Sequence, residues 1–313
     1  MFAGGTANSI HNYKEPRDGR SGKGMFSRIL FPTDFSEYAA KTLDCIAGFP
    51  GVRDVILLHV IKETISPRGG GEIGSALFHE GKITLKEEKR HLESLGENIR
   101  VRTEVKVASD IAGAIVQSAD ENAVSLIVIG ARGSSLVEEI LLGSVSKAVV
   151  RRSRTSVLIM RHKITLGLEG KTYEMFCPMI LSRVLCPVDF SVYSDNAIAR
   201  LRATPGVGEV ILLFVVSRGE TEQEIEYCQR RAEHRIEKMQ RDLATQGIRA
   251  KALVKRGNPS SEILRVAEEE DVSAVWMSSV GRGWFRELLL GSTADAVAVN
   301  SRRPVFIIRS KES

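Results

Sequence analysis

Short apolar runs alternate with amphipathic stretches along most of this 313-residue chain. The runs VILLHV at 55–60 and LIVIG at 126–130 have the length of strands and contain almost no polar side chain. Strands that are buried on both faces of a parallel sheet have this composition. The stretches between the runs carry apolar residues at helical spacing. This alternation predicts a doubly wound α/β domain.

The first half of the chain contains one full set of these elements. Strands are expected at 28–32, 54–60, 100–107, 125–129 and 156–160. Helices are expected from Ser36, near 83–95, near 110–122 and from Ser144. Such a set makes one domain of ordinary size, so 313 residues leave room for a second.

The second half repeats the first. SRILFPTDFSEYAAKTL at 27–43 returns as SRVLCPVDFSVYSDNAI at 182–198, and LLGSVSKAVV at 141–150 returns as LLGSTADAVA at 289–298. We call the two halves copy one and copy two. The repeat predicts a tandem duplication. The expected organisation is a flexible tail at 1–24, a first domain at 25–162, a linker at 163–180 and a second domain at 181–311.

Three glycines in copy one stand in the stretch GARGSSLVEEILLGS at 130–144. Gly130 and Gly133 let the backbone turn tightly and approach a ligand, because they carry no Cβ. Gly143 and Ser144 open a helix whose free N–H groups attract an anion. Ordinary turn and helix-cap chemistry is the alternative interpretation. Other strand ends, at PTD (32–34) and at His59 and Val60, would converge on this stretch where the strand order reverses.

The segments FPTDFS, ILLHVI and VIGARGSSLVEEILLGSVSKAVVRRSRTSVLIM resemble the universal stress protein family. The spacing G-x2-G-x9-G-S matches the adenine-nucleotide motif of that family, and the resemblance runs from Met25 to Arg309 in two copies. It implies two domains of the adenine nucleotide alpha hydrolase-like fold, each a five-stranded parallel sheet of order 3-2-1-4-5 flanked by helices. It also implies an ATP or AMP ligand, with Mg²⁺ as an optional companion.

The resemblance assigns the adenosine end of the ligand to three strand ends. Asp34 would contact the sugar or base, with Pro32 and Thr33 beside it. The backbone of Val60 would read the adenine edge, and Gly130 would lie under the ribose. From the residues alone, Asp34 could equally hydrogen-bond the backbone of the turn before the helix from Ser36.

The resemblance assigns the phosphates to the glycine-rich stretch and the helix after it. The residues that would hold them are Gly133, Gly143, Ser144, Val145 and Ser146, with Arg132 placed to neutralise charge. Copy two keeps Asp189, Gly281, Gly291 and Ser292 at matching positions. However, it has Ser278 for Gly130, Val280 for Arg132 and Ala294 for Ser146. These changes predict that copy two binds nucleotide much more weakly than copy one.

Strong catalysis is not expected, and no catalytic residue is assigned. The P-loop motif GxxxxGK[ST] does not occur, and the nearest acids to the loop, Glu138 and Glu139, lie inside its nine-residue spacer. The leading hypothesis is a nucleotide-binding stress-response or regulatory module. The alternatives are a weak ATP hydrolase or phosphotransferase, and a structural association module with a vestigial pocket.

In the resembling family the last strand pairs across a two-fold axis, which predicts pairing of the two copies within this chain. A homodimer of the tandem chain is left open.

Composition narrows the remaining possibilities. The formal charge is +5, but acids and bases are interleaved in LKEEKRHLE at 85–93 and YCQRRAEHRIEKMQRDLA at 227–244. Interleaved charge is typical of solvated helix faces and argues against nucleic acid as a partner. The four cysteines form no CxxC pair, and the six histidines have no metal-ligand spacing, so no metal site is expected. No apolar run is long enough to span a membrane, and no signal-peptide core is present, which predicts a cytoplasmic protein.

Overall fold

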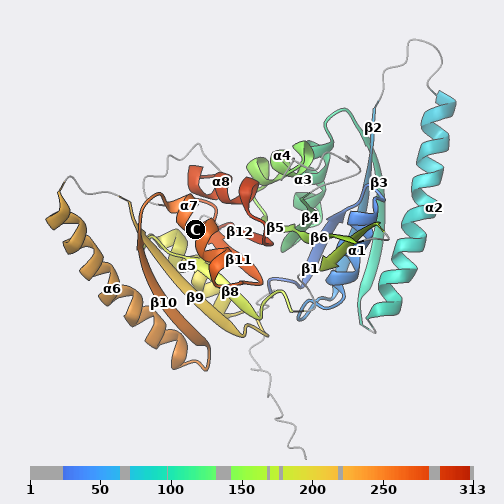
Figure 1. The fold of residues 1–313 in the computed structure, drawn as a ribbon. Helices are drawn as coiled ribbons and strands as arrows, with labels where there is room; N and C mark the ends of the chain where they lie inside the picture. Colours follow the sequence, from blue (N-terminus) through green and yellow to red (C-terminus); the bar gives the residue numbers. More distant parts are fainter. Residues whose placement is uncertain are drawn as a thin grey trace, which may run out of the picture.

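A ten-stranded sheet runs through both copies of the chain (Figure 1). The computed structural model describes residues 24–63, 71–96, 98–131, 142–167, 170–175, 179–217, 221–281 and 290–310. Within these residues each copy contributes five strands, and helices cover both faces of its sheet. The predicted α/β class is confirmed.

Copy one contains the expected alternation of strands and helices. Its elements are β1 (Arg28–Pro32), α1 (Glu37–Ile46), β2 (Asp54–Lys62), α2 (Gly71–Leu95), β3 (Arg100–Ala108), α3 (Ile111–Glu121), β4 (Leu126–Gly130), α4 (Ser144–Arg152) and β5 (Ser156–Met160). The helix expected near 83–95 is wrong at its start, because α2 begins at Gly71. Each glycine disfavours a helix by only about 1 kcal/mol, so the glycines of this segment do not exclude a helix.

Copy two repeats these elements with nearly the same lengths. They are β8 (Arg183–Pro187), α5 (Val192–Arg202), β9 (Glu209–Val216), α6 (Glu222–Ala244), β10 (Arg249–Arg256), α7 (Pro259–Glu269), β11 (Ala274–Ser278), α8 (Ser292–Asn300) and β12 (Val305–Ile308). The strand order is β3-β2-β1-β4-β5 in copy one and β10-β9-β8-β11-β12 in copy two. Both confirm the predicted order 3-2-1-4-5.

The two copies meet at their last strands. β5 pairs antiparallel with β12, and the register sets Val157 beside Ile307, Leu158 beside Phe306 and Ile159 beside Val305. Val157 in copy one corresponds to Val305 in copy two, so this register is symmetric about the pair Leu158 and Phe306. The last strands therefore form the pairing within one chain that the sequence predicted, around an approximate two-fold axis.

Each face of the sheet carries one apolar core that continues from copy to copy. One core includes Phe26 and Leu158 from copy one together with Trp276 and Phe306 from copy two. The ring of Phe306 lies 4.7 Å from the ring of Trp276 and 6.1 Å from the ring of Phe26, measured between centroids. Burial of large apolar side chains is the main favourable contribution to folding, so the pairing of the copies is part of the core.

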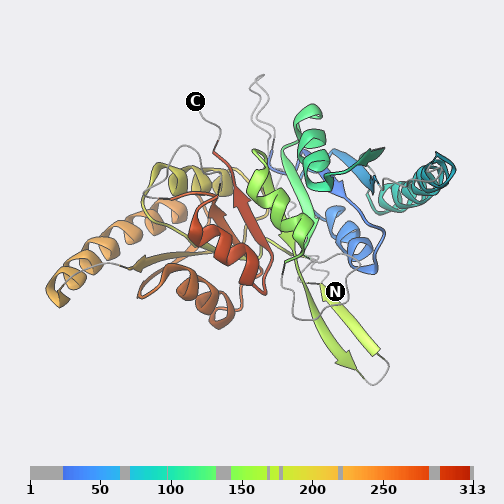
Figure 2. The ribbon, with the colours of Figure 1, turned by 90° about the horizontal axis from the view of Figure 1, so that it is seen from above.

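The segment between the copies contains a hairpin that the sequence reading treated only as a linker. β6 (His162–Gly167) pairs antiparallel with β7 (Gly170–Met175) in a separate two-stranded sheet. Figure 2 shows this hairpin projecting from the body of the molecule. In the same view α2 and α6 lie at the two opposite ends of the molecule.

Candidate functional site

The strand order of copy one reverses between β1 and β4, and we call the space beyond the carboxyl ends of these two strands the crevice. β1 pairs with β2 as far as Pro32 beside Leu58, but it pairs with β4 only at Ile29 and Leu30. The carboxyl ends of β1 and β4 therefore part. Ligands of open α/β sheets bind at such a switch point, so this end of the sheet is the candidate site.

The turn after β1 forms one wall of this crevice. Asp34 Oδ1 accepts hydrogen bonds from the backbone N of Ser36 at 3.1 Å and from its Oγ at 2.6 Å. Ser36 is in turn the N-cap of α1. Phe35 between them has a φ of 61°, which is strained for a residue with a large side chain. Asp34 thus shapes the turn, as the alternative interpretation expected, and its side chain is exposed beside the crevice.

The end of β2 offers backbone groups to the same crevice. Leu58 O accepts a hydrogen bond from Thr33 N at 2.9 Å, so this carbonyl points toward β1. Groups two residues apart on a strand point to the same side, so Val60 directs its N–H and C=O the same way. β1 ends at Pro32, whereas β2 continues to Lys62. The backbone of Val60 therefore borders the crevice beyond the last residue of β1.

The start of α4 forms the opposite wall. Its N-cap is Gly143, with no side-chain hydrogen bond to the first turn, and its first helical residues are Ser144, Val145 and Ser146. Gly143 N donates to Ala131 O at 2.7 Å, and Ser146 Oγ donates to Gly130 O at 2.8 Å. These bonds tie the helix start to the end of β4. The N–H groups of the first turn have no acceptor inside a helix, so they suit an anion. Arg132 and Gly133 lie outside the described residues.

Glu88 is a candidate that the sequence reading missed. Its stretch was interpreted as a solvated helix face, but its Oε1 accepts a hydrogen bond from Thr33 Oγ1 at 3.0 Å. Its Oε2 is buried and has no hydrogen-bond partner among the described residues. Burial raises the pKa of Glu88 to about 7, and nearby Asp34 adds to the rise, while Thr33 and His91 oppose it. The only available signal was its place three residues after Leu85 on the buried face of α2.

His59 has the packing role that a strand-end histidine usually has. Its Nδ1 lies 2.9 Å from Thr33 O, and its ring stacks on Phe35 with 4.2 Å between centroids. A Cβ at Gly81 would lie 3.1 Å from the imidazole, so this glycine lets α2 approach β2 at His59. The sequence analysis assigned His59 no function, and these contacts explain its presence by packing alone.

The family model described as "Universal stress protein family" matches residues 25–161 and 181–309. The chain belongs to the universal stress protein family. One relative is a universal stress protein of Methanocaldococcus jannaschii, 31% identical over a 160-residue alignment that covers 44% of this chain and 97% of the relative. The universal stress protein YxiE of Bacillus subtilis is 32% identical over 152 residues, covering 44% of this chain and all of YxiE.

A solved structure shares the whole tandem arrangement. The crystal structure of a universal stress protein from Archaeoglobus fulgidus is 25% identical, with a TM-score of 0.69, and the match covers 91% of this chain and 97% of that one. Single-domain relatives thus match one copy, whereas this structure matches both copies together.

The corresponding turn in copy two of this universal stress protein places its aspartate against Gly281. Asp189 Oδ1 accepts hydrogen bonds from Ser191, as Asp34 does from Ser36. However, Asp189 Oδ2 lies only 2.5 Å from where a Cβ on Gly281 would stand. Gly281 aligns with Gly133, a residue assigned to the phosphates. In copy two the carboxylate therefore lies directly against the start of the loop.

The hydrogen bond between Thr33 and Glu88 has an apolar pair at its place in copy two. The buried faces of α2 and α6 align when Leu85 is set on Ile236. Met239 then takes the position of Glu88, and Val188 takes that of Thr33. An apolar pair thus replaces the hydrogen-bonded pair.

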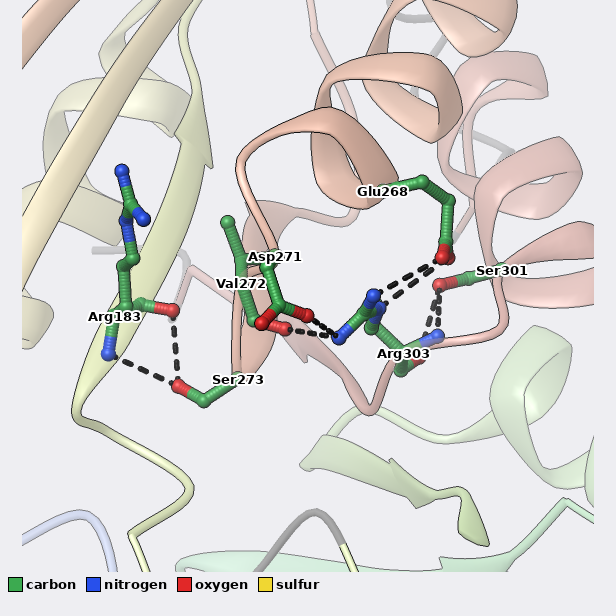
Figure 3. A network of polar contacts seen from close by, with 7 residues as sticks. All are labelled: Arg183, Glu268, Asp271, Val272, Ser273, Ser301 and Arg303. Atoms are coloured by element: carbon green, nitrogen blue, oxygen red, sulfur yellow. Dashed lines mark hydrogen bonds and ion pairs between the residues drawn. The ribbon is translucent and has the colours of Figure 1, made fainter. Parts of the chain in front are cut away.

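Charged networks at the amino ends of the strands are far from this site. In copy two, Arg303 forms ion pairs with Glu268 at 3.0 Å and with Asp271 at 2.8 Å, and Ser273 Oγ bonds the backbone of Arg183 (Figure 3). In copy one, a pocket of about 440 Å³ is lined by Arg28, Asp54, Arg100, Arg102, Glu121 and Asn122. Ligands of parallel sheets bind at the opposite, carboxyl edge, so we interpret these groups as structural.

The described residues were also searched for metal-binding groups and for membrane-spanning helices. Among them, no group of three or more His, Cys, Asp or Glu side chains could hold a metal ion. None of the described helices is both long enough and apolar enough to cross a membrane.

Proposed function

We propose that copy one binds an adenine nucleotide, ATP or AMP, and that its occupancy serves a stress-response role. Membership of the universal stress protein family supports the stress-response role. The observation that carries the nucleotide proposal is the first turn of α4. It opens without a side-chain cap at the crevice where β1 and β4 part.

The residues at the crevice fit the parts of a nucleotide. Amides of the first turn of α4 suit phosphate oxygens, because the positive end of the helix dipole lies there. The backbone edge at Val60 offers a donor and an acceptor, which is what an adenine edge requires. Asp34, exposed beside the crevice, is within the same wall and suits a ribose hydroxyl. Mg²⁺ prefers phosphate oxygens and water, so it would accompany ATP rather than occupy a protein site.

One substitution, Gly143→Asp, should abolish phosphate binding and leave folding intact. Gly143→Asp keeps a preferred N-cap residue, and a Cβ there meets only Ala131 O at an ordinary 3.5 Å. The new carboxylate would take the amides that the phosphates need and would repel them. Titration calorimetry on the full chain should show one ATP or AMP per wild-type chain and no binding by Gly143→Asp.

Copy two supplies the matched control. Gly291→Asp makes the same change at the N-cap of α8, where a Cβ would lie 3.5 Å from Ser279 O. This variant should keep the wild-type affinity, as should Asp189→Ala, whereas Asp34→Ala should lose it. Wild-type affinity in Gly143→Asp would refute the proposal. ATP turnover by the wild type above that of Gly143→Asp would instead favour the hydrolase alternative.

A further inference from the structure

Two arginines cross between the copies at the two-fold axis. Arg161 follows β5 and donates through Nη2 to Ala298 O at 2.7 Å and to Val299 O at 3.3 Å, at the end of α8. Arg309 follows β12 and donates through Nη2 to Val150 O, near the end of α4. Each copy thus sends an arginine to the last helix of the other copy.

Arg309 carries a buried positive charge that no described carboxylate balances. Its side chain is 5% exposed, and among the described residues no carboxylate forms an ion pair with it. Its Nε and Nη1 are buried and have no hydrogen-bond partner in the part of the chain that the structure describes. Burial lowers the pKa of Arg309 to about 10, which leaves it charged at neutral pH. A buried cation of this kind is costly unless something negative faces it.

The carboxyl end of α4 supplies that negative partner. Helix dipoles place partial negative charge on the last carbonyl groups, where a cation is stabilising. Arg309 meets these carbonyls from inside the protein, whereas Arg151 on the surface of α4 pairs with Asp295 of α8 at 2.7 Å. The backbone of Arg309 is also fixed, because its N donates to Ser156 Oγ at 3.0 Å. The backbone of Arg309 is therefore tied to the first residue of β5 while its side chain reaches α4.

The same helix begins at the proposed phosphate site. α4 has nine residues, so its two ends lie only about 13 Å apart. An anion at the amino end and a buried cation at the carboxyl end both interact favourably with one dipole. The two interactions also hold the helix in one position, with Gly130 and Ser146 joined at its start.

We propose that Arg309 of copy two is a positioning residue for the phosphate site of copy one. It holds α4 at the carboxyl end, so that the amides at the amino end are aligned for a phosphate group. Arg161 does the same for α8, whose amino end belongs to the corresponding site of copy two. This inference rests on the proposed function, and it adds that the phosphate site depends on the other copy.

The test compares ATP with adenosine on full-length variants. Arg309→Met should weaken ATP binding by about tenfold and leave adenosine binding unchanged, because only the phosphates use α4. Arg309→Gln should behave like Arg309→Met, and Arg309→Lys should restore part of the ATP affinity. Arg161→Met is the matched control and should leave both affinities of copy one unchanged. Equal losses for ATP and adenosine, or an equal effect of Arg161→Met, would overturn the proposal.

A second measurement needs no ligand. Hydrogen exchange of the α4 amides should speed up in Arg309→Gln and stay at the wild-type rate in Arg161→Gln, which should affect α8 instead. Unchanged exchange in α4 would also overturn the positioning role. Absence of ATP binding by the wild type, with faster exchange of α4 in Arg309→Gln, would refute the proposed function but leave the contact between Arg309 and α4 established.

Discussion

Copy one and copy two share one fold but differ at the same corner of it. Both turns after the first strand have an aspartate that bonds the N-cap serine, and both last helices begin after a glycine N-cap. In copy one the buried Thr33 donates a hydrogen bond to the half-buried Glu88 beside the turn. In copy two Val188 and Met239 take the positions of this pair, and Arg235 lies over the Phe190 ring of the turn at 4.1 Å. The difference teaches that the scaffold is retained for stability, while the polar residues around the crevice are free to diverge.

The pairing of the last strands gives the largest expected effect. Phe306 and Leu158 face each other across the two-fold axis, and both are fully buried. Phe306→Ala should lower the free energy of unfolding by about 3–5 kcal/mol and Leu158→Ala by about 2–5 kcal/mol. Urea titration of the whole chain measures both.

Because the cores are continuous, each truncation should shift the unfolding of both copies together. Val192→Ala is the control, because that side chain is 64% exposed, and it should have little effect. A two-step transition in Phe306→Ala, with copy one still unfolding at the wild-type midpoint, would show that the copies are stable independently.

Glu88 gives a smaller effect that depends on pH. Its pKa is about 7 in the folded protein and about 4.5 when unfolded, so the unfolded chain releases this proton at lower pH. The stability that the protonated carboxyl contributes is complete below about pH 4.5 and is lost as the pH rises through 7. The loss is at most about 3 kcal/mol, because water partly screens the side chain.

Glu88→Gln removes this titration and keeps an acceptor for Thr33. The variant should be more stable than the wild type at pH 8 and nearly equal to it at pH 4.5, as measured by urea unfolding at both values. Glu87→Gln changes an exposed neighbour and is the control. Parallel pH profiles for Glu88→Gln and the wild type would contradict the raised pKa, and with it one of the differences between the copies.

Ser146 gives the smallest expected effect. Its hydroxyl bonds Gly130 O at 2.8 Å, and copy two has the buried Ala294 at that position. Ser146→Ala should cost about 1 kcal/mol of stability, the usual net value of such a hydrogen bond. Thermal unfolding would detect it as a shift of a few degrees. No shift would mean that this hydrogen bond does not help to hold the start of α4.

Periodicity predicted the fold well because its signals are local. The strands at 28–32 and 156–160 were predicted at their observed bounds, since apolar runs between turn residues leave little choice. The start of α2 and the hairpin β6–β7 were missed, because the glycines in both segments suggest a loop. The binding roles assigned to the site residues stay predictions. Asp34, Val60, Gly143 and Ser146 border the crevice, Arg132 and Gly133 lie outside the described residues, and Glu88 looked like any other solvated acid.

The sequence by itself determined the duplication, the strand order implied by the resemblance, and the motif at the carboxyl ends of β1 and β4. These features follow from residue spacing, which is fixed along the chain. Only the tertiary structure decided that Glu88 is buried against Thr33 and that Arg309 reaches α4 of the other copy. Those contacts join residues 55 and 159 positions apart, and both depend on how elements pack. Burial and charge compensation are set by such packing, and a charged residue in the sequence carries no mark of it.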